Sequence, residues 1–205
     1  MHTEILSIEQ KSLLDWAKQF KREFYLVGGT AIALYIGHRK SIDFDLFKLK
    51  SVNSRKCMTA VSKSGFPYSV LFRDVDQIHF IVNGVKVTFF QYPYEIIAKQ
   101  DVEGVFRVPA LLDLAAMKAF ALGRRSKWKD YVDLYFLLKD HFRLEQICTR
   151  ATEIFGGEFS EKLFRAQLCY FEGVDYSEDV DWLIPNPPTI EEIQDGLIAM
   201  ATNEV

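Results

Sequence analysis

The residues best suited to do chemistry lie in the stretch from Phe24 to Phe47. Two carboxylates, Asp43 and Asp45, alternate with apolar residues in a segment, Ile42 to Phe47, that predicts a β-strand. Side chains alternate along a strand, so both carboxylates would share one face, about 7 Å apart. Two unit charges at that separation repel by about 2.4 kcal/mol at an effective dielectric near 20, which invites a cation between them. Hard carboxylate ligands suit Mg²⁺ or Mn²⁺, so we predict a metal site at Asp43 and Asp45.

A glycine-rich turn precedes these carboxylates. Gly28, Gly29 and Thr30 follow an apolar strand, Phe24 to Val27, and lead into a short helix, Ala31 to Ile36. Glycine lets the backbone approach a ligand closely. A helix N-terminus presents open N–H groups and the positive end of its dipole, which together favour phosphate. Each signal is common alone, but the order of strand, glycine turn, helix and Asp-x-Asp strand is far more specific.

This stretch resembles the first motif of the polymerase β-type nucleotidyltransferases, and more closely that of the AbiEii/AbiGii family of bacterial nucleotidyltransferase toxins. Residues 39–46, RKSIDFDL, fit that family's Arg-x-Ser-h-Asp-h-Asp-h segment at every position. The resemblance implies that the nucleotide is bound by Gly28, Gly29, Thr30, Arg39 and Ser41.

The same resemblance implies a fold and an activity. The fold would be α/β (α+β), with a nucleotidyltransferase core on a small mixed sheet in residues 1–108 and a helical C-terminal part in residues 109–205. The activity would be Mg²⁺-dependent transfer of a nucleotide from an NTP to an acceptor, which is tRNA in some members. The protein would be a toxin, and its antitoxin partner would be a separate protein.

A second cluster of candidate residues lies between Leu111 and Asp140, which predicts two helices joined at Gly123. Lys118 has only apolar neighbours three and four positions away, and Asp133 is the only charge from residue 131 to 138. A charge in an apolar stripe is costly unless it is paired or reaches a cleft. Two interpretations stay open: a buried structural ion pair, or a functional pair that faces the nucleotide.

The resemblance favours the functional interpretation. AbiEii-like proteins carry a Met-Lys motif on one helix and a Lys-Asp-h-x-Asp-Leu motif on the next. Met117-Lys118 and residues 129–134, KDYVDL, match these motifs. The resemblance implies that Lys118 is catalytic and binds the nucleotide phosphates, and that Asp130 or Asp133 positions the acceptor. The sequence does not decide between the two aspartates, although we expect Asp130 to be the more exposed.

Four cations and one tryptophan occupy residues 124–129, RRSKWK, between these helices. Such a run could contact polyphosphate or an RNA backbone. A solvated loop whose cations favour a helix C-terminus is an equally good interpretation.

One departure from the wider superfamily concerns the third carboxylate that usually lies on a neighbouring strand. Thr88 occupies the corresponding place in VKVTFFQYP. This leaves a single tightly held ion, or a third ligand from elsewhere, as alternatives to a two-metal site. Asp74 and Asp76 are candidates by charge only, and we assign them to a polar hairpin turn.

Composition narrows the function classes. The 205 residues are 49% hydrophobic and 26% charged, with a net charge of −3, so the whole molecule is not an electrostatic nucleic-acid binder. Any contact with a polyanion must come from a local basic patch. Three widely spaced cysteines show no metal-site spacing. With no signal peptide and no run of 18 apolar residues, the expectation is a cytoplasmic protein without a membrane span.

The remaining pattern predicts the following elements: a first helix from a capping box at Ser7 to about Lys21, a helix within residues 51–66, strands at Tyr68 to Arg73, Ile78 to Val82 and Val85 to Gln91, and helices at Arg143 to Phe155, Ser160 to Phe171 and Thr189 to Thr202. Asn83-Gly84 predicts a two-residue hairpin.

Two alternatives to the RNA-modifying enzyme stay open. A catalytically impaired relative would bind a nucleotide or a protein partner, and Thr88 is its best support. A small-molecule nucleotidyltransferase, for example one acting on an aminoglycoside, is compatible with the near-neutral charge.

Overall fold

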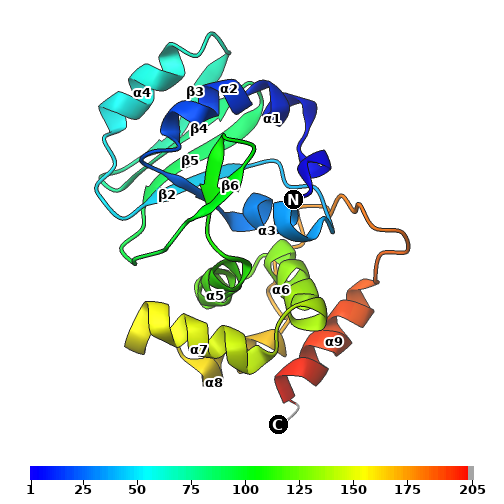
Figure 1. Cartoon of the computed structure of the whole chain (residues 1–205). Coiled ribbons are helices and arrows are strands. Elements are labelled where there is room, and N and C mark those ends of the chain that lie inside the picture. Colours follow the sequence, from blue (N-terminus) through cyan, green and yellow to red (C-terminus); the bar gives the residue numbers. More distant parts are fainter. Residues whose placement is uncertain (203–205) are drawn as a thin grey trace. The chain divides into compact units, whose positions relative to one another are not determined.

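The computed structural model describes residues 1–202, in which the chain forms two compact units, Met1–Ala110 and Leu111–Val205. The first unit contains a five-stranded mixed sheet, and the second consists of helices (Figure 1). This confirms the predicted fold class. None of the helices in residues 1–202 is long and apolar enough to cross a membrane.

The sheet has the strand order β1-β2-β5-β4-β3. β2 runs parallel to β5, and the other neighbours are antiparallel. One face carries buried apolar residues, including Phe44, Val87 and Phe80. The strands are β1 (Tyr25–Val27), β2 (Phe44–Lys48), β3 (Tyr68–Arg73), β4 (Gln77–Val82) and β5 (Val85–Gln91).

Helices of the first unit cover the apolar face of the sheet. The rings of Phe20 and Phe24 pack edge-on against Phe89 of β5, and α4 packs against β3 and β4. Figure 1 shows α2 and α4 beside these strands. The helical elements are η1 (Thr3–Ile5), α1 (Ile8–Ser12), α2 (Leu14–Ala17), η2 (Lys18–Phe20), α3 (Gly28–Ile36) and α4 (Ser54–Ser62).

The first predicted helix is not continuous in the structure: it is divided into α1, α2 and η2. Its capping box at Ser7 is present, but the helix breaks at Leu13, whose N–H donates to the carbonyl of Gln10 at 3.1 Å. This tighter bond ends α1, and the fully buried Leu13 side chain holds the break in place. The segment ends as the 3₁₀ turn η2.

A small hairpin formed by β6 (Gln100–Val102) and β7 (Phe106–Val108) was not predicted. Each strand has three residues, too few for an alternating pattern to stand out. β7 packs against β1, and its Phe106 ring contacts Phe44 at 5.1 Å between centroids. The predicted hairpin at Asn83-Gly84 is confirmed, with both residues at positive φ.

The second unit is built around two helices. α5 packs against α6, α7 and α8, while α6 and α8 pack against α9. α8 ends at Leu168, three residues before the predicted Phe171, and residues 173–188 form neither helix nor strand. The helices are α5 (Leu111–Leu122), α6 (Trp128–Asp140), α7 (Leu144–Phe155), α8 (Glu161–Leu168) and α9 (Ile190–Thr202), with the 3₁₀ turn η3 (Gly156–Glu158).

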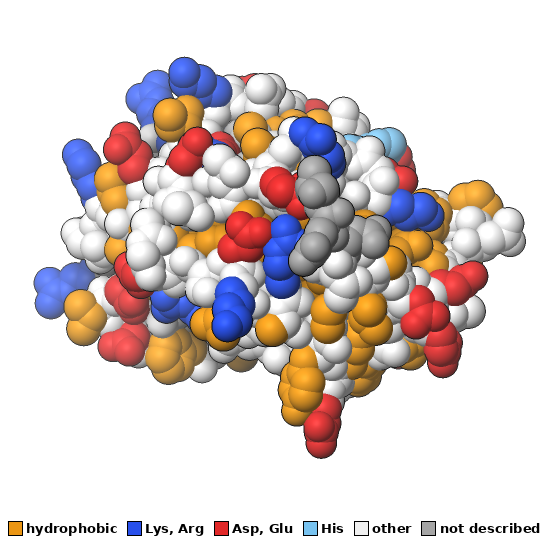
Figure 2. All heavy atoms as spheres, turned by 90° about the horizontal axis from the view of Figure 1, so that it is seen from below, with side chains coloured by type: hydrophobic (Ala, Val, Ile, Leu, Met, Phe, Trp, Pro, Cys, Tyr) orange, Lys and Arg blue, Asp and Glu red, His pale blue; other side chains and the backbone are white. Residues whose placement is uncertain are grey.

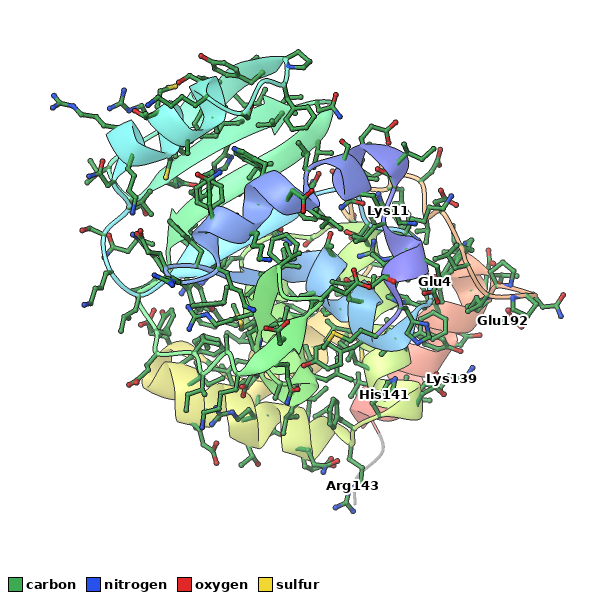
Figure 3. The ribbon with its side chains drawn as sticks, turned by 45° about the horizontal axis from the view of Figure 1, so that its top comes forward. Glu4, Lys11, Lys139, His141, Arg143 and Glu192 are labelled. Atoms are coloured by element: carbon green, nitrogen blue, oxygen red, sulfur yellow. The ribbon has the colours of Figure 1, made fainter. Side chains whose placement is uncertain are left out.

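Many charged residues outside the candidate sites lie at the surface. Figure 3 labels Lys11 of α1, Lys139 of α6 and Glu192 of α9, which are all exposed.

The contact between α6 and α9 predicts that replacing a helical glycine with alanine destabilises the protein. A Cβ atom at Gly196 would lie 2.6 Å from Cε2 of Tyr135. Gly196→Ala should therefore lower the free energy of unfolding by about 1 kcal/mol, because overpacking of about 1–3 kcal/mol exceeds the gain in helix propensity. Urea unfolding measures the change. Gly157→Ala, where the added atom meets open space, is the control, and equal stability of both variants would contradict the prediction.

Candidate active site

The two predicted metal ligands lie at the start of β2. Asp45 is within the strand, whereas Asp43 precedes it, because β2 begins at Phe44 and not at the predicted Ile42. The Ile42 side chain is 59% exposed and lies outside the sheet. Asp45 is opposite Val27 of β1 and Thr88 of β5.

Asp45 is in close contact with the glycine turn. Gly28 has φ +73°, and a Cβ atom at this position would lie 2.5 Å from Oδ2 of Asp45. Only glycine tolerates both the left-handed backbone and this approach. The predicted Gly28-Gly29 turn is in fact the first turn of α3. Because Val27 has no side chain that could cap this helix, its first N–H groups remain suited to oxygen ligands.

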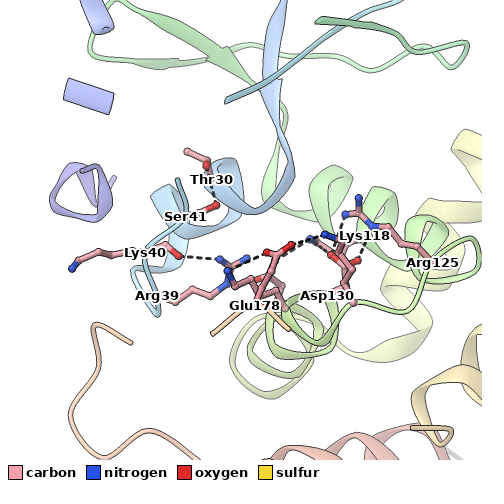
Figure 4. Close-up of polar contacts among 11 residues, drawn as sticks. Thr30, Arg39, Lys40, Ser41, Lys118, Arg125, Asp130 and Glu178 are labelled. Atoms are coloured by element: carbon pink, nitrogen blue, oxygen red, sulfur yellow. Dashed lines mark hydrogen bonds and ion pairs between the residues drawn. The ribbon is translucent and has the colours of Figure 1, made fainter. Parts of the chain in front are cut away.

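The nucleotide-binding residues that were predicted in the first unit surround the same turn, whereas Lys118 lies on α5 of the second unit. A Cβ atom at Gly29 would lie 2.6 Å from Nη2 of Arg39 and 3.1 Å from Oγ of Ser41. Thr30 Oγ1 lies 2.9 Å from Ser41 Oγ (Figure 4) and 2.5 Å from the carbonyl oxygen of Asp43. The Arg39 side chain is buried, so a guanidinium lies under the start of α3. The structure therefore brings Gly28, Gly29, Thr30, Arg39 and Ser41 together with the Asp-x-Asp strand.

Thr88 and His79 extend the polar row that starts at Asp45. Cross-strand partners share a sheet face, and the register aligns Asp45 with Thr88, Thr88 with His79, and His79 with Phe72. The Thr88 hydroxyl is buried and has no hydrogen-bond partner among the described residues. Burial, and then the charge of Lys86, lower the pKa of His79, while Asp45 and Asp76 oppose this shift. Sequence reasoning missed His79, because its neighbours follow only from the register.

The donor set fits a magnesium ion held by two carboxylates. Asp43 and Asp45 offer hard oxygens at the start of β2, the buried Thr88 hydroxyl lies on the strand beside Asp45, and the Asp43 carboxylate is 39% exposed. Lys86 Nζ lies 4.0 Å from Oδ2 of Asp43 and reduces the repulsion between the carboxylates. Within residues 1–202, no three His, Cys, Asp or Glu side chains gather as a metal site. Asp74 and Asp76 lie at the β3–β4 turn, where the Asp74 N–H donates to the Gln77 carbonyl.

A buried ionic cluster occupies the second unit. Lys118 Nζ of α5 lies 2.7 Å from Oδ1 of Asp130 and 2.9 Å from Oδ2 of Asp133, both on α6. Arg125 Nε donates to Oδ2 of Asp130 at 2.8 Å (Figure 4). The structure thus confirms that the two helices turn these charges toward one another. These contacts join two cations to two carboxylates within the second unit.

Burial does not separate the two aspartates. Asp130 is 2% exposed and Asp133 is 0% exposed, so Asp130 is the more exposed as expected, but both are buried and the difference assigns no role. Burial alone would raise the pKa of Asp130, but the charges of Lys118 and Arg125 outweigh it and hold this pKa below its usual value. The stability that Asp130 contributes is therefore present above the ordinary carboxyl pKa and is lost as the pH falls through the lowered one.

The basic run at residues 124–129 is committed to internal contacts. Arg124 pairs with Glu158 at 3.2 Å, and Lys127 and Lys129 both pair with Glu178, at 2.5 and 3.2 Å. Arg125 belongs to the ionic cluster, and Trp128 is buried at 6% exposure. Each of the four cations thus has a carboxylate partner, so this run is not the local basic patch that the net charge requires.

Comparison with known proteins identifies the family. The family model described as "Nucleotidyl transferase AbiEii toxin, Type IV TA system" matches residues 12–196. The chain belongs to the AbiEii family. The chain is also 36% identical over 124 residues to a protein of Aquifex aeolicus named "Uncharacterized protein aq_aa25". This match covers 58% of the chain and 59% of that relative, so the chain spans about three fifths of its length.

Solved structures of the same fold are known. JHP933 from Helicobacter pylori superposes with a TM-score of 0.58 at 20% identity, over 96% of this chain and 91% of that one. MenT4, the nucleotidyltransferase toxin Rv2826c from Mycobacterium tuberculosis H37Rv, gives a TM-score of 0.61 at 14% identity, over 95% of this chain and 81% of that one. At these identities the likeness establishes the fold.

The contact between Gly28 and Asp45 predicts a loss of metal binding on a one-atom change. Gly28→Ala should displace the Asp45 carboxylate and weaken Mn²⁺ binding at least about tenfold, measured by isothermal titration. Gly65→Ala is the matched control, because Gly65 has φ +79° and the added atom meets nothing within 4 Å. Both variants should lose about 1–2 kcal/mol of stability from the left-handed backbone. Equal Mn²⁺ affinity in the two variants would contradict the role of this contact.

The ionic cluster predicts a strong dependence of stability on Lys118. Lys118→Met leaves Asp130 and Asp133 buried with one cation fewer, which should cost about 3–5 kcal/mol in the free energy of unfolding. Denaturant unfolding at pH 7 measures it. Lys129→Met, which removes an exposed pair with Glu178, should cost less than about 1 kcal/mol. A small cost for both variants would show that the cluster contributes little to the fold.

Proposed function

We propose that this protein is a metal-dependent nucleotidyltransferase that moves a nucleotide from an NTP to an acceptor and acts as the toxin of a toxin–antitoxin pair. The antitoxin is a separate protein. One observation carries the proposal: the first turn of α3 contacts the Asp45 carboxylate so closely that no side chain fits between them. A helix N-terminus suited to phosphate and carboxylates suited to a cation therefore meet at one place.

The first unit supplies the residues that bind the triphosphate. The N–H groups of Gly28 and Gly29 donate hydrogen bonds to phosphate oxygens at the positive end of the α3 dipole. Arg39 and the hydroxyls of Thr30 and Ser41, which lie beside the same turn, add positive charge and hydrogen bonds. Asp43 and Asp45 would hold Mg²⁺ or Mn²⁺, and the ion would supply charge neutralisation for the phosphates.

The second unit supplies charge for the transfer step. We assign to Lys118 the stabilisation of negative charge that develops on the phosphates. Asp130 and Asp133 fix the Lys118 ammonium at 2.7 and 2.9 Å, and one of them positions the acceptor hydroxyl. Phosphoryl transfer needs mainly positioning and charge stabilisation, which such an ordered cluster can provide. The acceptor that we propose is RNA, with tRNA as the first candidate.

A catalytically impaired protein is the second candidate. The buried Thr88 hydroxyl, which has no partner among the described residues, stands beside Asp45 where a third carboxylate would be expected. A site with two carboxylates holds an ion less tightly than a site with three. This candidate binds the nucleotide but does not transfer it.

The test compares two double variants that remove equal charge. Asp43→Asn/Asp45→Asn should abolish transfer of label from each α-labelled NTP to total bacterial RNA in the presence of Mg²⁺, a loss of at least about 100-fold. Asp74→Asn/Asp76→Asn, at the β3–β4 turn, should leave transfer unchanged. The labelled RNA, separated on a gel, identifies both the base and the acceptor.

Other outcomes decide between the alternatives. Nucleotide binding without transfer would favour the impaired protein. Transfer to a panel of aminoglycosides but not to RNA would favour a small-molecule acceptor. Loss of activity in both double variants would show that the effect is one of charge and not of the predicted site.

A further inference from the structure

A second charged surface lies on the opposite face of the sheet from Asp45. The chain has no acidic residue between Asp45 and Asp74, although this stretch contains six of the 25 lysines and arginines. The rest of the chain therefore carries the excess of acidic charge. The six cations of this acid-free segment, residues 46–73, are Lys48, Lys50, Arg55, Lys56, Lys63 and Arg73.

The fold gathers three of these lysines around one cavity. Lys48 is three residues from Asp45 along the strand, so its side chain points to the other face. There it meets Lys56 of α4 and Lys63, the residue that follows α4. These two lysines are about two helical turns apart and so lie on one side of the helix. Together with the helical segment before β1, they line a cavity of about 460 Å³.

The wall of this cavity is aromatic. Trp16, Phe20 and Phe24 line it, and Lys48 Nζ lies 4.6 Å from the centre of the Phe24 ring. Trp16 is held in place by a hydrogen bond from Nε1 to the Ala60 carbonyl at 3.0 Å. Phe20 and Phe24 are buried, whereas Trp16 is partly exposed and can stack a single nucleobase.

Positive charge at the cavity exceeds negative charge. Glu23 is the one acidic residue among the described residues that line it, and both Lys48 and Lys56 pair with this carboxylate. The bond from Lys56 and, after the opposing effect of burial, the bond from Lys48 hold the pKa of Glu23 below its usual value. Lys63 adds a third, exposed cation.

Other cations of the chain lie among more carboxylates. The four cations of residues 124–129 pair with three carboxylates, Glu158, Glu178 and Asp130, whereas three lysines at the cavity face one, Glu23. On the face of the molecule in Figure 2, basic and acidic side chains drawn in colour are interspersed. The cavity beside α4 thus combines an excess of lysine with an aromatic wall.

We infer that this lysine-rimmed aromatic cavity binds single-stranded polynucleotide, with one base against Trp16 and the neighbouring phosphates on Lys48, Lys56 and Lys63. The inference rests on the proposed function only in naming the acceptor as a nucleic acid. The cavity and Asp45 lie on opposite faces of the sheet. The cavity therefore holds a part of the polynucleotide that is remote from its reacting end. The exposed strand β3, which ends in Arg73, forms an edge of the sheet, where the two faces meet.

The experiment measures binding without catalysis. Fluorescein-labelled 20-nucleotide RNA and DNA of one mixed sequence are titrated with the full chain in the absence of NTP and Mg²⁺, over a range of salt concentrations. Lys56→Gln/Lys63→Gln should weaken binding at least about tenfold and reduce the salt slope by about 1.4. The control with equal charge change is Lys11→Gln/Lys139→Gln, two exposed lysines that point outward elsewhere (Figure 3), which should bind like wild type.

Two further readouts make the test specific. The oligonucleotide should quench tryptophan fluorescence in wild type, and Trp16→Phe should remove that quenching. Equal weakening in both lysine double variants, or equally tight binding of polyglutamate, would overturn the inference, the latter in favour of an acidic protein partner. Asp43→Asn/Asp45→Asn should still bind the oligonucleotide, so failure of the transfer assay and failure of this inference are distinguishable.

Discussion

The contact between the Gly28 backbone and the Asp45 carboxylate is the constraint on which the first unit depends. A side chain at residue 28 would occupy the place of a carboxylate oxygen, so β1 can turn into α3 above β2 only with glycine there. The Thr30 hydroxyl fixes the far side of the turn through the Asp43 carbonyl. Behind β2, the fully buried Phe44 and Leu46 anchor the strand in the core. Backbone geometry and core packing thus determine where the two carboxylates lie.

In the second unit the corresponding constraint is electrostatic. Lys118 is 5% exposed, and a cation at such a depth is stable only with partners. The two aspartates of α6 provide them, and they tie α6 to α5. Such a cluster adds little net stability compared with a well-packed apolar core, but loss of one member is costly. It therefore fixes the relative register of two helices whose other contacts are apolar and less directional.

Local patterns in the sequence predicted the order of elements, the buried face of β2 with Phe44 and Leu46, and the pairing of Lys118 with α6. They failed where a property depends on distant partners. The break at Leu13 arises from burial of its side chain, and the alignment of His79 with Thr88 and Asp45 arises from strand register. The run at residues 124–129 resembles a basic patch in the sequence because Glu158 and Glu178, which pair with three of its four cations, lie 29 or more residues away. Alternation and capping are local signals, whereas burial and charge pairing are tertiary ones.

The parallel pairing of β2 with β5 also governs when the site can form during synthesis. β2 ends at Lys48 and β5 begins at Val85, so α4, β3 and β4 are made before the strand that flanks Asp45 exists. Non-local pairing of this kind carries a loop-closure cost and slows folding. In a nascent chain, β2 can therefore pair only with β1 until β5, which ends at Gln91, has left the ribosome. The proposed metal site is thus completed late in translation of the first unit, at a time set by topology and not by the position of its aspartates in the sequence.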